Sequence, residues 1–136
     1  MNYLNGEEVK TSGIDFQVGY QLLDVLPGAI GFDLDGSYVL EYKIADQFDA
    51  SGTIKLGDAE DLAGQLNYNR GPAFTSKPEL KTNFTVSYTT DDHYASLITR
   101  HIGSYDDTGA PAYLSNLATV DAQTTFDAHY NYQGIE

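Results

Sequence analysis

The chain contains no cysteine and no tryptophan, and its single methionine is Met1. Without cysteine it can form no disulfide framework, no thiolate zinc site and no thiol nucleophile. Basic residues are also scarce, because 7 Lys and Arg stand against 20 Asp and Glu and give a net charge of −13. A chain this acidic repels the phosphate backbone, so we expect no nucleic-acid partner.

Long hydrophobic runs are also missing from the sequence. No segment approaches the roughly 18 consecutive apolar residues of a transmembrane helix. The first eight residues, MNYLNGEE, lack the basic start and the apolar run of a secretory signal. Membrane-crossing strands are not excluded by these absences, because they show only alternation of apolar and polar residues. What the chain does have is 11 Tyr, 6 Phe and 13 Gly, a composition typical of β-structure with many turns.

Apolar and polar side chains alternate in five segments of the chain. Because successive side chains of a strand point to opposite faces, this pattern predicts five antiparallel strands. Each segment reaches the roughly 9 to 11 residues that a tilted membrane-spanning strand needs. In the fourth segment the two faces are too similar to assign. The predicted strands are Gly13–Gln21, Ile30–Lys43, Leu80–Tyr88, His93–Tyr105 and Thr119–Gln133.

The other four segments have one apolar face and one polar face. In a barrel wall we expect the apolar face to meet lipid and the polar face to line the lumen. The predicted lipid-facing residues are Ile14, Phe16, Val18, Phe32, Leu34, Phe84, Val86 and Phe126. The predicted lumen-facing residues are Asp15, Gln17, Asp33, Asp35, Glu41, Asp121, Asp127 and His129.

The connections between the predicted strands alternate between short and long. Leu22–Gly28 and Thr90–Asp92 are short, whereas Ile44–Lys77 and Asp106–Ala118 are long. Connections in outer-membrane barrels alternate in the same way, with short periplasmic turns and long outer loops. A soluble β-sandwich also alternates, but its turn signals usually recur every 8 to 12 residues.

These patterns predict an all-β fold, an antiparallel amphipathic meander that forms part of the wall of a transmembrane β-barrel. We assign residues 13–133 to this single partial barrel and residues 1–12 to a preceding loop or strand start. Closed bacterial barrels begin at about 8 strands, so five strands leave open sheet edges that invite pairing with another chain.

No constellation of residues predicts catalysis or a bound cofactor. His93, His101 and His129 lie on separate segments without metal-ligand spacing, and no Ser-His-Asp order or nucleophile elbow is present. Asp33–Gly36 is similar to part of a calcium loop, but Tyr42 stands where the bidentate carboxylate belongs. We therefore expect a protein that is not an enzyme and that holds neither metal nor cofactor.

Tyrosines gather toward the ends of the predicted strands, and acidic residues gather in the long connections. In a barrel the tyrosines would form interfacial girdles, whereas in a sandwich they would pack in the core or across strands. The acids are either solvated loop residues or, in a receptor for a cationic or metal-bearing ligand, part of its capture site. They are Asp46, Asp49, Asp58, Glu60, Asp61, Asp106 and Asp107.

The succession of these segments resembles the C-terminal half of the barrel of TonB-dependent outer-membrane receptors. The resemblance spans roughly Thr11–Tyr132 and rests on the order of its pieces, because each piece alone is a short β pattern. The pieces are Lys10–Phe16 (KTSGIDF), Leu34–Leu40, Pro78–Thr89, Leu97–Tyr105 and Thr119–Tyr130.

The resemblance implies a wall segment of a plugged barrel in the bacterial outer membrane that takes up siderophore, cobalamin or glycan-type ligands. Its implied partners are outer-membrane lipid, the remainder of the barrel and plug, and a small-molecule ligand bound by the outer loops. The sequence shows no plug and no recognisable energy-coupling box, so we expect a segment rather than a complete receptor. The alternative is a small extracellular β-protein that assembles with copies of itself through open sheet edges, as a structural or filament subunit.

Overall fold

The computed structural model describes residues 8–24, 26–49, 51–66, 77–108 and 118–134. These residues are all-β and contain no helix. Residue contacts divide the chain into two compact units, which we call the sheet unit and the short-strand unit. The sheet unit comprises Asp15–Tyr38, Leu80–Gly103 and Ala122–Glu136, and the short-strand unit comprises Met1–Ile14, Val39–Glu79 and Ser104–Asp121.

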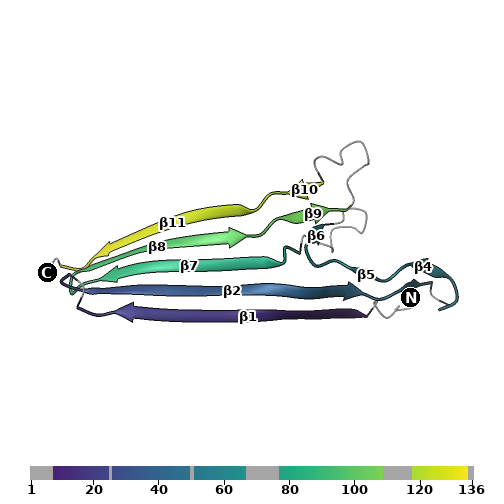
Figure 1. Ribbon diagram of the computed structural model, residues 1–136, viewed down its shortest axis with the longest axis horizontal. Coiled ribbons are helices and arrows are strands. Elements are labelled where there is room, and N and C mark those ends of the chain that lie inside the picture. Colours follow the sequence, from purple (N-terminus) through teal and green to yellow (C-terminus); the bar gives the residue numbers. More distant parts are fainter. Residues whose placement is uncertain (1–7, 25, 50, 67–76, 109–117, 135–136) are drawn as a thin grey trace. The chain divides into compact units, whose positions relative to one another are not determined.

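Five long strands form the principal sheet, in the order β1-β2-β7-β8-β11 (Figure 1). Each strand follows its neighbour along the chain, apart from the short strands inserted between them, so the sheet is a meander. The predicted antiparallel all-β architecture is confirmed. Strands β1 and β2 contribute residues to both units. The strands are β1 (Val9–Leu22), β2 (Ala29–Ile44), β7 (Leu80–Thr89), β8 (His93–Ile102) and β11 (Gln123–Tyr132).

Two short turns join consecutive strands of the sheet unit, as the sequence predicts. Between β7 and β8, the Thr90 amide donates to the His93 carbonyl at 2.8 Å, and the His93 amide donates to Thr90 Oγ1 at 2.9 Å. Between β1 and β2, the Gly28 amide donates to the Leu26 carbonyl at 2.7 Å. Leu26 has a φ of 57°, a left-handed conformation that is strained for a bulky residue.

Strand register brings the apolar side chains of neighbouring strands onto one face. Leu34 of β2 lies opposite Phe84 of β7, and Phe84 and Phe126 both lie opposite Thr99 of β8. Asp33 lies one residue away from Leu34 and therefore points to the other face. The two faces of the sheet unit thus differ in polarity along β1, β2, β7 and β11.

The register also assigns the faces of β8, which the alternation alone left open. Leu97 lies opposite Val86 and Ala128, so it belongs to the apolar face. Ile98 and Arg100 belong to the polar face. Alternation could not decide this, because Leu97 and Ile98 place one large apolar side chain on each face.

The sheet unit is a single layer. None of its described side chains is buried, whereas the two buried hydrophobic residues of the described chain, Ile44 and Leu62, belong to the short-strand unit. Within the described residues β1 and β11 do not pair with each other, so the sheet does not close on itself. The second layer that a β-sandwich requires is not present in the described parts of the sheet unit.

The short-strand unit holds the parts of the chain predicted as long loops. There β3 and β4 form a hairpin, β5 pairs with the end of β2, and β9 pairs antiparallel with β10 and parallel with β6. Part of the predicted loop Ile44–Lys77 is therefore paired; residues 67–76 lie outside the described residues. The short strands are β3 (Gln47–Phe48), β4 (Lys55–Gly57), β5 (Glu60–Asp61), β6 (Gln65–Leu66), β9 (Tyr105–Asp107) and β10 (Thr119–Val120).

Three predicted strands are wrong in their extent, and the first of them, Gly13–Gln21, begins at Val9 instead. The segment Thr119–Gln133 is interrupted at residues 121–122, because β10 pairs with β9 whereas β11 pairs with β8. The segment His93–Tyr105 ends its first strand at Ile102. The Gly103 amide then donates to the Leu80 carbonyl at 2.8 Å, and a separate strand, β9, begins at Tyr105.

Gly36 of β2 allows a close approach between strands on the apolar face. A Cβ atom at this position would lie 2.6 Å from Phe16 Cζ, 2.7 Å from the Lys81 carbonyl oxygen and 2.9 Å from Thr82 Cγ2. Because the carbonyl belongs to the backbone of β7, it cannot move without displacing the strand. We expect Gly36→Ala to lower the free energy of unfolding by about 1–3 kcal/mol, the usual effect of overpacking.

Gly19→Ala is the matched control, because a Cβ atom there would meet only Asp33 Oδ1, the end of a flexible side chain, at 3.0 Å. Urea unfolding of the two variants in detergent micelles, followed by circular dichroism, gives both free energies. Equal losses in the two variants would contradict the close packing of β1, β2 and β7.

Candidate functional site

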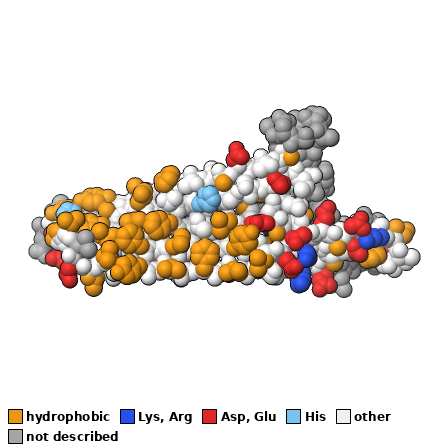
Figure 2. Space-filling model, viewed as in Figure 1, with side chains coloured by type: hydrophobic (Ala, Val, Ile, Leu, Met, Phe, Trp, Pro, Cys, Tyr) orange, Lys and Arg blue, Asp and Glu red, His pale blue; other side chains and the backbone are white. Residues whose placement is uncertain are grey.

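The candidate functional site is the apolar face of the sheet unit, which Figure 2 views directly. Its hydrophobic side chains lie side by side over the strands and remain open to solvent; Phe126 is 67% exposed and Val18 is 62% exposed. The face is formed by Phe16, Val18, Tyr20, Ile30, Phe32, Leu34, Tyr38, Leu80, Phe84, Val86, Tyr88, Ala95, Leu97, Phe126, Ala128, Tyr130 and Tyr132.

Leaving this face exposed to water forgoes a free energy of burial comparable to the total stability of a folded domain. Full burial of one Val, Leu or Phe side chain stabilises by about 1.5–3 kcal/mol. Several such side chains together amount to roughly 10 kcal/mol, and a folded domain has a total stability of only about 5–15 kcal/mol. Contiguous apolar patches of this kind mark membrane or protein contacts in soluble and membrane proteins alike. Some apolar medium or partner must therefore cover the face.

The apolar face is hollowed near the end that carries the short turns. An open depression of about 740 Å³ lies between β2, β7, β8 and β11, and Leu26 of the first turn borders it. Its walls are almost entirely apolar and include Ile30, Val86, Leu97 and Tyr130. The depression contains no cluster of charged groups, so it suits a hydrocarbon chain or an apolar side chain.

Aromatic residues with polar tips lie at the same end of β8 and β11. The His93 Nδ1 atom is 2.9 Å from the Tyr130 hydroxyl oxygen, and the His93 ring stacks on Tyr132 with 4.8 Å between centroids. Rings that bury their apolar faces while their polar atoms stay hydrogen-bonded are typical of a boundary between apolar and aqueous surroundings. The sequence predicted such a girdle for the tyrosines but not for His93.

The opposite face of the sheet unit carries a network of polar contacts. The Asn83 side-chain amide donates to Asp35 Oδ2 at 2.8 Å, and Arg100 forms an ion pair with Asp127. Because Asp35 lies opposite Asn83 and Asn83 opposite Arg100, these contacts follow one row across four strands. The Asn83 amide is thereby engaged inside a strand.

The register separates the predicted lipid-facing residues from the predicted lumen-facing ones. In the sheet unit the predicted lipid-facing residues lie on the apolar face and the predicted lumen-facing residues lie on the polar face. Contact with lipid or with a lumen stays a prediction. Ile14, Glu41 and Asp121 belong to the short-strand unit. Those on the apolar face are Phe16, Val18, Phe32, Leu34, Phe84, Val86 and Phe126, and those on the polar face are Asp15, Gln17, Asp33, Asp35, Asp127 and His129.

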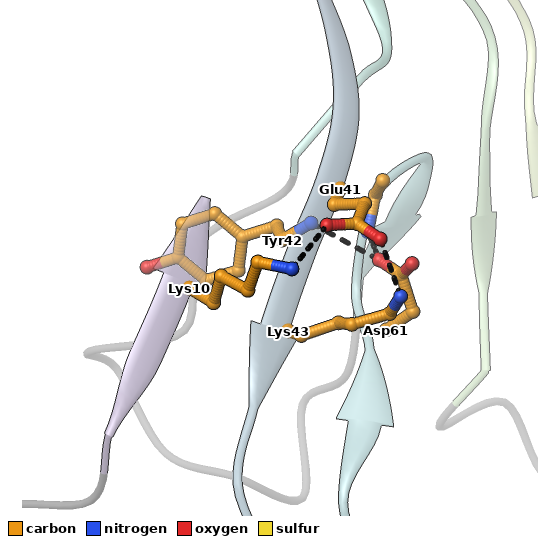
Figure 3. Close-up of polar contacts among 6 residues, drawn as sticks. Lys10, Glu41, Tyr42, Lys43 and Asp61 are labelled. Atoms are coloured by element: carbon orange, nitrogen blue, oxygen red, sulfur yellow. Dashed lines mark hydrogen bonds and ion pairs between the residues drawn. The ribbon is translucent and has the colours of Figure 1, made fainter. Parts of the chain in front are cut away.

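Glu41 is part of a charged cluster in the short-strand unit (Figure 3). Its carboxylate lies 2.5 Å from Lys43 Nζ and 3.4 Å from Lys10 Nζ, and thereby links β1 to β2. Asp61 of β5 accepts a hydrogen bond from the Tyr42 amide at 3.1 Å. Exposed ion pairs of this kind add little stability. The sequence could not predict it, because Lys10 and Glu41 are far apart along the chain.

Asp121 lies in the interruption between β10 and β11 and is exposed. Its predicted place in a continuous strand is therefore wrong. The alternation of Val120, Ala122 and Thr124 continues through the break and gives no sign of it.

Several of the acidic residues predicted to lie in loops hold backbone turns together. Asp49 Oδ1 accepts hydrogen bonds from the Thr53 and Ile54 amides at 2.9 and 3.0 Å, and the Ser51 hydroxyl donates to Asp49 Oδ2 at 2.7 Å. These donors, with the Ile54 amide foremost, lower the pKa of Asp49 to about 2. Asp49 is thus engaged within the β3–β4 hairpin.

Two further acids make comparable contacts. Asp46 Oδ1 accepts from the Ala59 amide at 2.7 Å and lies 2.9 Å from Lys55 Nζ, and the Lys55 contact is the principal reason that its pKa is lowered. The Tyr42 amide is the main group that lowers the pKa of Asp61. Among the described residues no group of three or more His, Asp or Glu side chains is placed to hold a metal ion.

No family model matches the chain, and no curated protein or solved structure is significantly similar to it. In the described part of the chain, no helix is long and apolar enough to cross a membrane.

The Asp49 contacts give a prediction for acidic pH. A carboxylate whose pKa is lowered in the folded state stabilises the hairpin above its unfolded pKa of about 3.9, and this stabilisation is lost as the pH falls toward about 2. The amide chemical shifts of Thr53 and Ile54 should therefore titrate together with a midpoint near 2. In Asp49→Ala both titrations should vanish, whereas Asp91→Ala, in the β7–β8 turn, should leave them unchanged. A midpoint near 4 would contradict the assigned hydrogen bonds.

Proposed function

We propose that the chain is one wall segment of a transport barrel in the bacterial outer membrane, of the TonB-dependent receptor type. The observation that carries this proposal is the single-layer sheet, apolar on one face and polar on the other, with no layer over the apolar face in the described residues. The hydrocarbon of a lipid bilayer can cover the whole of such an apolar face. The polar row of Asp35, Asn83 and Arg100 would then line an aqueous lumen.

Strand length supports this proposal. β7, β8 and β11 have 10 residues each, and β1 and β2 have 14 and 16. A tilted strand needs about 9–11 residues to cross the hydrocarbon region, so each strand is long enough. The aromatic contacts of His93, Tyr130 and Tyr132 occur where a membrane interface would meet the strand ends.

The remaining partners follow from the same proposal. The rest of the barrel and its plug would complete the wall and close the lumen, and a siderophore, cobalamin or glycan-type ligand would meet the outer loops. The short turns would be periplasmic. The acids of the short-strand unit contribute to a negative surface that would attract a cationic or metal-bearing ligand, although Asp46, Asp49 and Asp61 already accept backbone hydrogen bonds.

A second candidate function is assembly of an extracellular β-protein with copies of itself. The open edges favour it, because within the described residues β1 pairs with β2 alone and β11 pairs with β8 alone. An exposed strand edge is a template for pairing with another chain. In this case the apolar faces of neighbouring copies would cover one another in water.

Arginine substitutions on adjacent residues of β7 separate these two functions. Phe84 lies on the apolar face between Leu34 and Thr99, and Thr85 lies on the polar face opposite Asp33. An Arg on the lipid face near the midplane costs about 2–4 kcal/mol, so Phe84→Arg should lower the ratio of folded to unfolded chain by about 30-fold or more. Thr85→Arg should change it little, because Arg there faces water and Asp33.

The measurement is the ratio of folded to unfolded chain for each variant, obtained by urea unfolding in phosphocholine detergent micelles, whose hydrated headgroups can reach the open strand edges. Equal ratios for the two variants would contradict the lipid-facing assignment. Failure of the unsubstituted chain to fold in micelles, together with growth of filaments in water, would favour the second candidate.

A further inference from the structure

The edge strands of the sheet unit run in the same direction. Neighbouring strands are antiparallel, and Figure 1 shows the arrows of β1, β7 and β11 pointing one way and those of β2 and β8 the other. In any antiparallel sheet with an odd number of strands, the two edge strands run in the same direction. The direction of the two edges determines which partner can complete the sheet.

The free edge of β11 can be assigned residue by residue. The Gln133 amide donates to the Asp92 carbonyl at 2.9 Å, and these residues lie directly opposite each other when the β8–β11 register is extended by one pair. Backbone groups of successive strand residues point to alternate sides. His129, four residues from Gln133, therefore directs its amide toward β8, whereas Ala128 directs its amide and carbonyl away from the sheet. Within the described residues nothing pairs with this outer row.

An unpaired edge is tolerable in water but not in a bilayer. Hydrocarbon offers no hydrogen-bond partner to the outer row of β11, so membrane-spanning sheets must be closed. Bacterial outer-membrane barrels built from a single chain close with an even number of antiparallel strands, and their short turns all lie on one side of the membrane.

A second copy of the chain cannot meet these conditions. When two copies have the same orientation in the membrane, β11 of one lies parallel to β1 of the other. Antiparallel pairing of two copies must join β11 to β11 or β1 to β1, about a twofold axis perpendicular to the sheet. This axis keeps both apolar faces toward lipid but places the short turns of the two copies on opposite sides of the membrane.

We therefore infer that the partner of the two open edges is a β-sheet segment of different sequence with an odd number of strands, and not a second copy of this chain. Both edge strands of this partner run antiparallel to β1 and β11. At least three strands are needed, because the smallest closed bacterial barrels have eight. This inference rests on the proposed function, since it requires the apolar face to meet lipid.

A fusion protein tests the inference with a defined partner. The full chain is followed by a short Gly-rich linker and a second copy of residues 29–102, whose long strands β2, β7 and β8 supply the required odd number. A short linker suffices, because β11 ends at the short-turn end of the sheet, where β2 begins. Refolded in phosphatidylcholine vesicles, this eight-stranded fusion should close and migrate differently on gels before and after heating.

The matched control is a tandem of two full copies, ten strands in all, joined by a long Gly/Ser linker. Its junction between β11 and the second β1 would be parallel, so we expect no heat-dependent change in migration. A closed ten-stranded tandem would overturn the inference, as would an open eight-stranded fusion. If the eight-stranded fusion enters vesicles but stays open, or if the ten-stranded tandem closes, only this inference fails; if neither fusion enters vesicles, the proposed function fails as well.

Proline substitutions then test the assigned edge. Pro is tolerated on an edge strand only where the missing amide faces away from its neighbour. Ala128→Pro should therefore leave the strand content of the unfused chain unchanged, yet abolish most of the heat-dependent shift of the eight-stranded fusion. His129→Pro should reduce strand content in both proteins. If Ala128→Pro left the shift of the fusion intact, the outer row of β11 would not be the closing edge.

Discussion

A single constraint governs this molecule: a one-layer sheet cannot cover its own apolar face. Alternation and strand register place aromatic and aliphatic side chains of five strands on the same side, and no described residue of the sheet unit becomes buried. Hydrophobic burial is the dominant favourable term in folding. The sheet therefore depends on a surrounding apolar medium or partner for the stability that a second layer supplies in a sandwich.

The two units differ in how they are built and in whether they bury apolar residues. The sheet unit has long strands, tight turns and a polar row that includes Asn83 and Arg100. The short-strand unit contains the buried pair Ile44 and Leu62, and carboxylates such as Asp49 fix its turns. The sheet unit leaves its apolar residues exposed, whereas the short-strand unit buries two of its own.

The sequence predicted the long strands and their faces because period-two alternation reports both directly. It failed where that signal is absent or misleading. Leu97 and Ile98 put similar side chains on opposite faces of β8, and the two-residue strands are too short to show a period. Alternation runs unbroken past Asp121 although the strand does not. The contacts of Glu41 depend on Lys10, a partner distant in sequence, which only the folded chain brings near.

The central claim, that the apolar face meets lipid, is tested most directly by single spin labels along β11. The chain has no native cysteine, so each residue from 124 to 132, which occurs once in the eight-stranded fusion, can be replaced there by Cys and labelled after folding in vesicles. Relaxation by oxygen, which concentrates in lipid, should peak at even-numbered positions, and relaxation by a water-soluble nickel chelate should peak at odd-numbered ones. Greater nickel accessibility at positions 126 and 128 than at 125 and 127 would contradict the account.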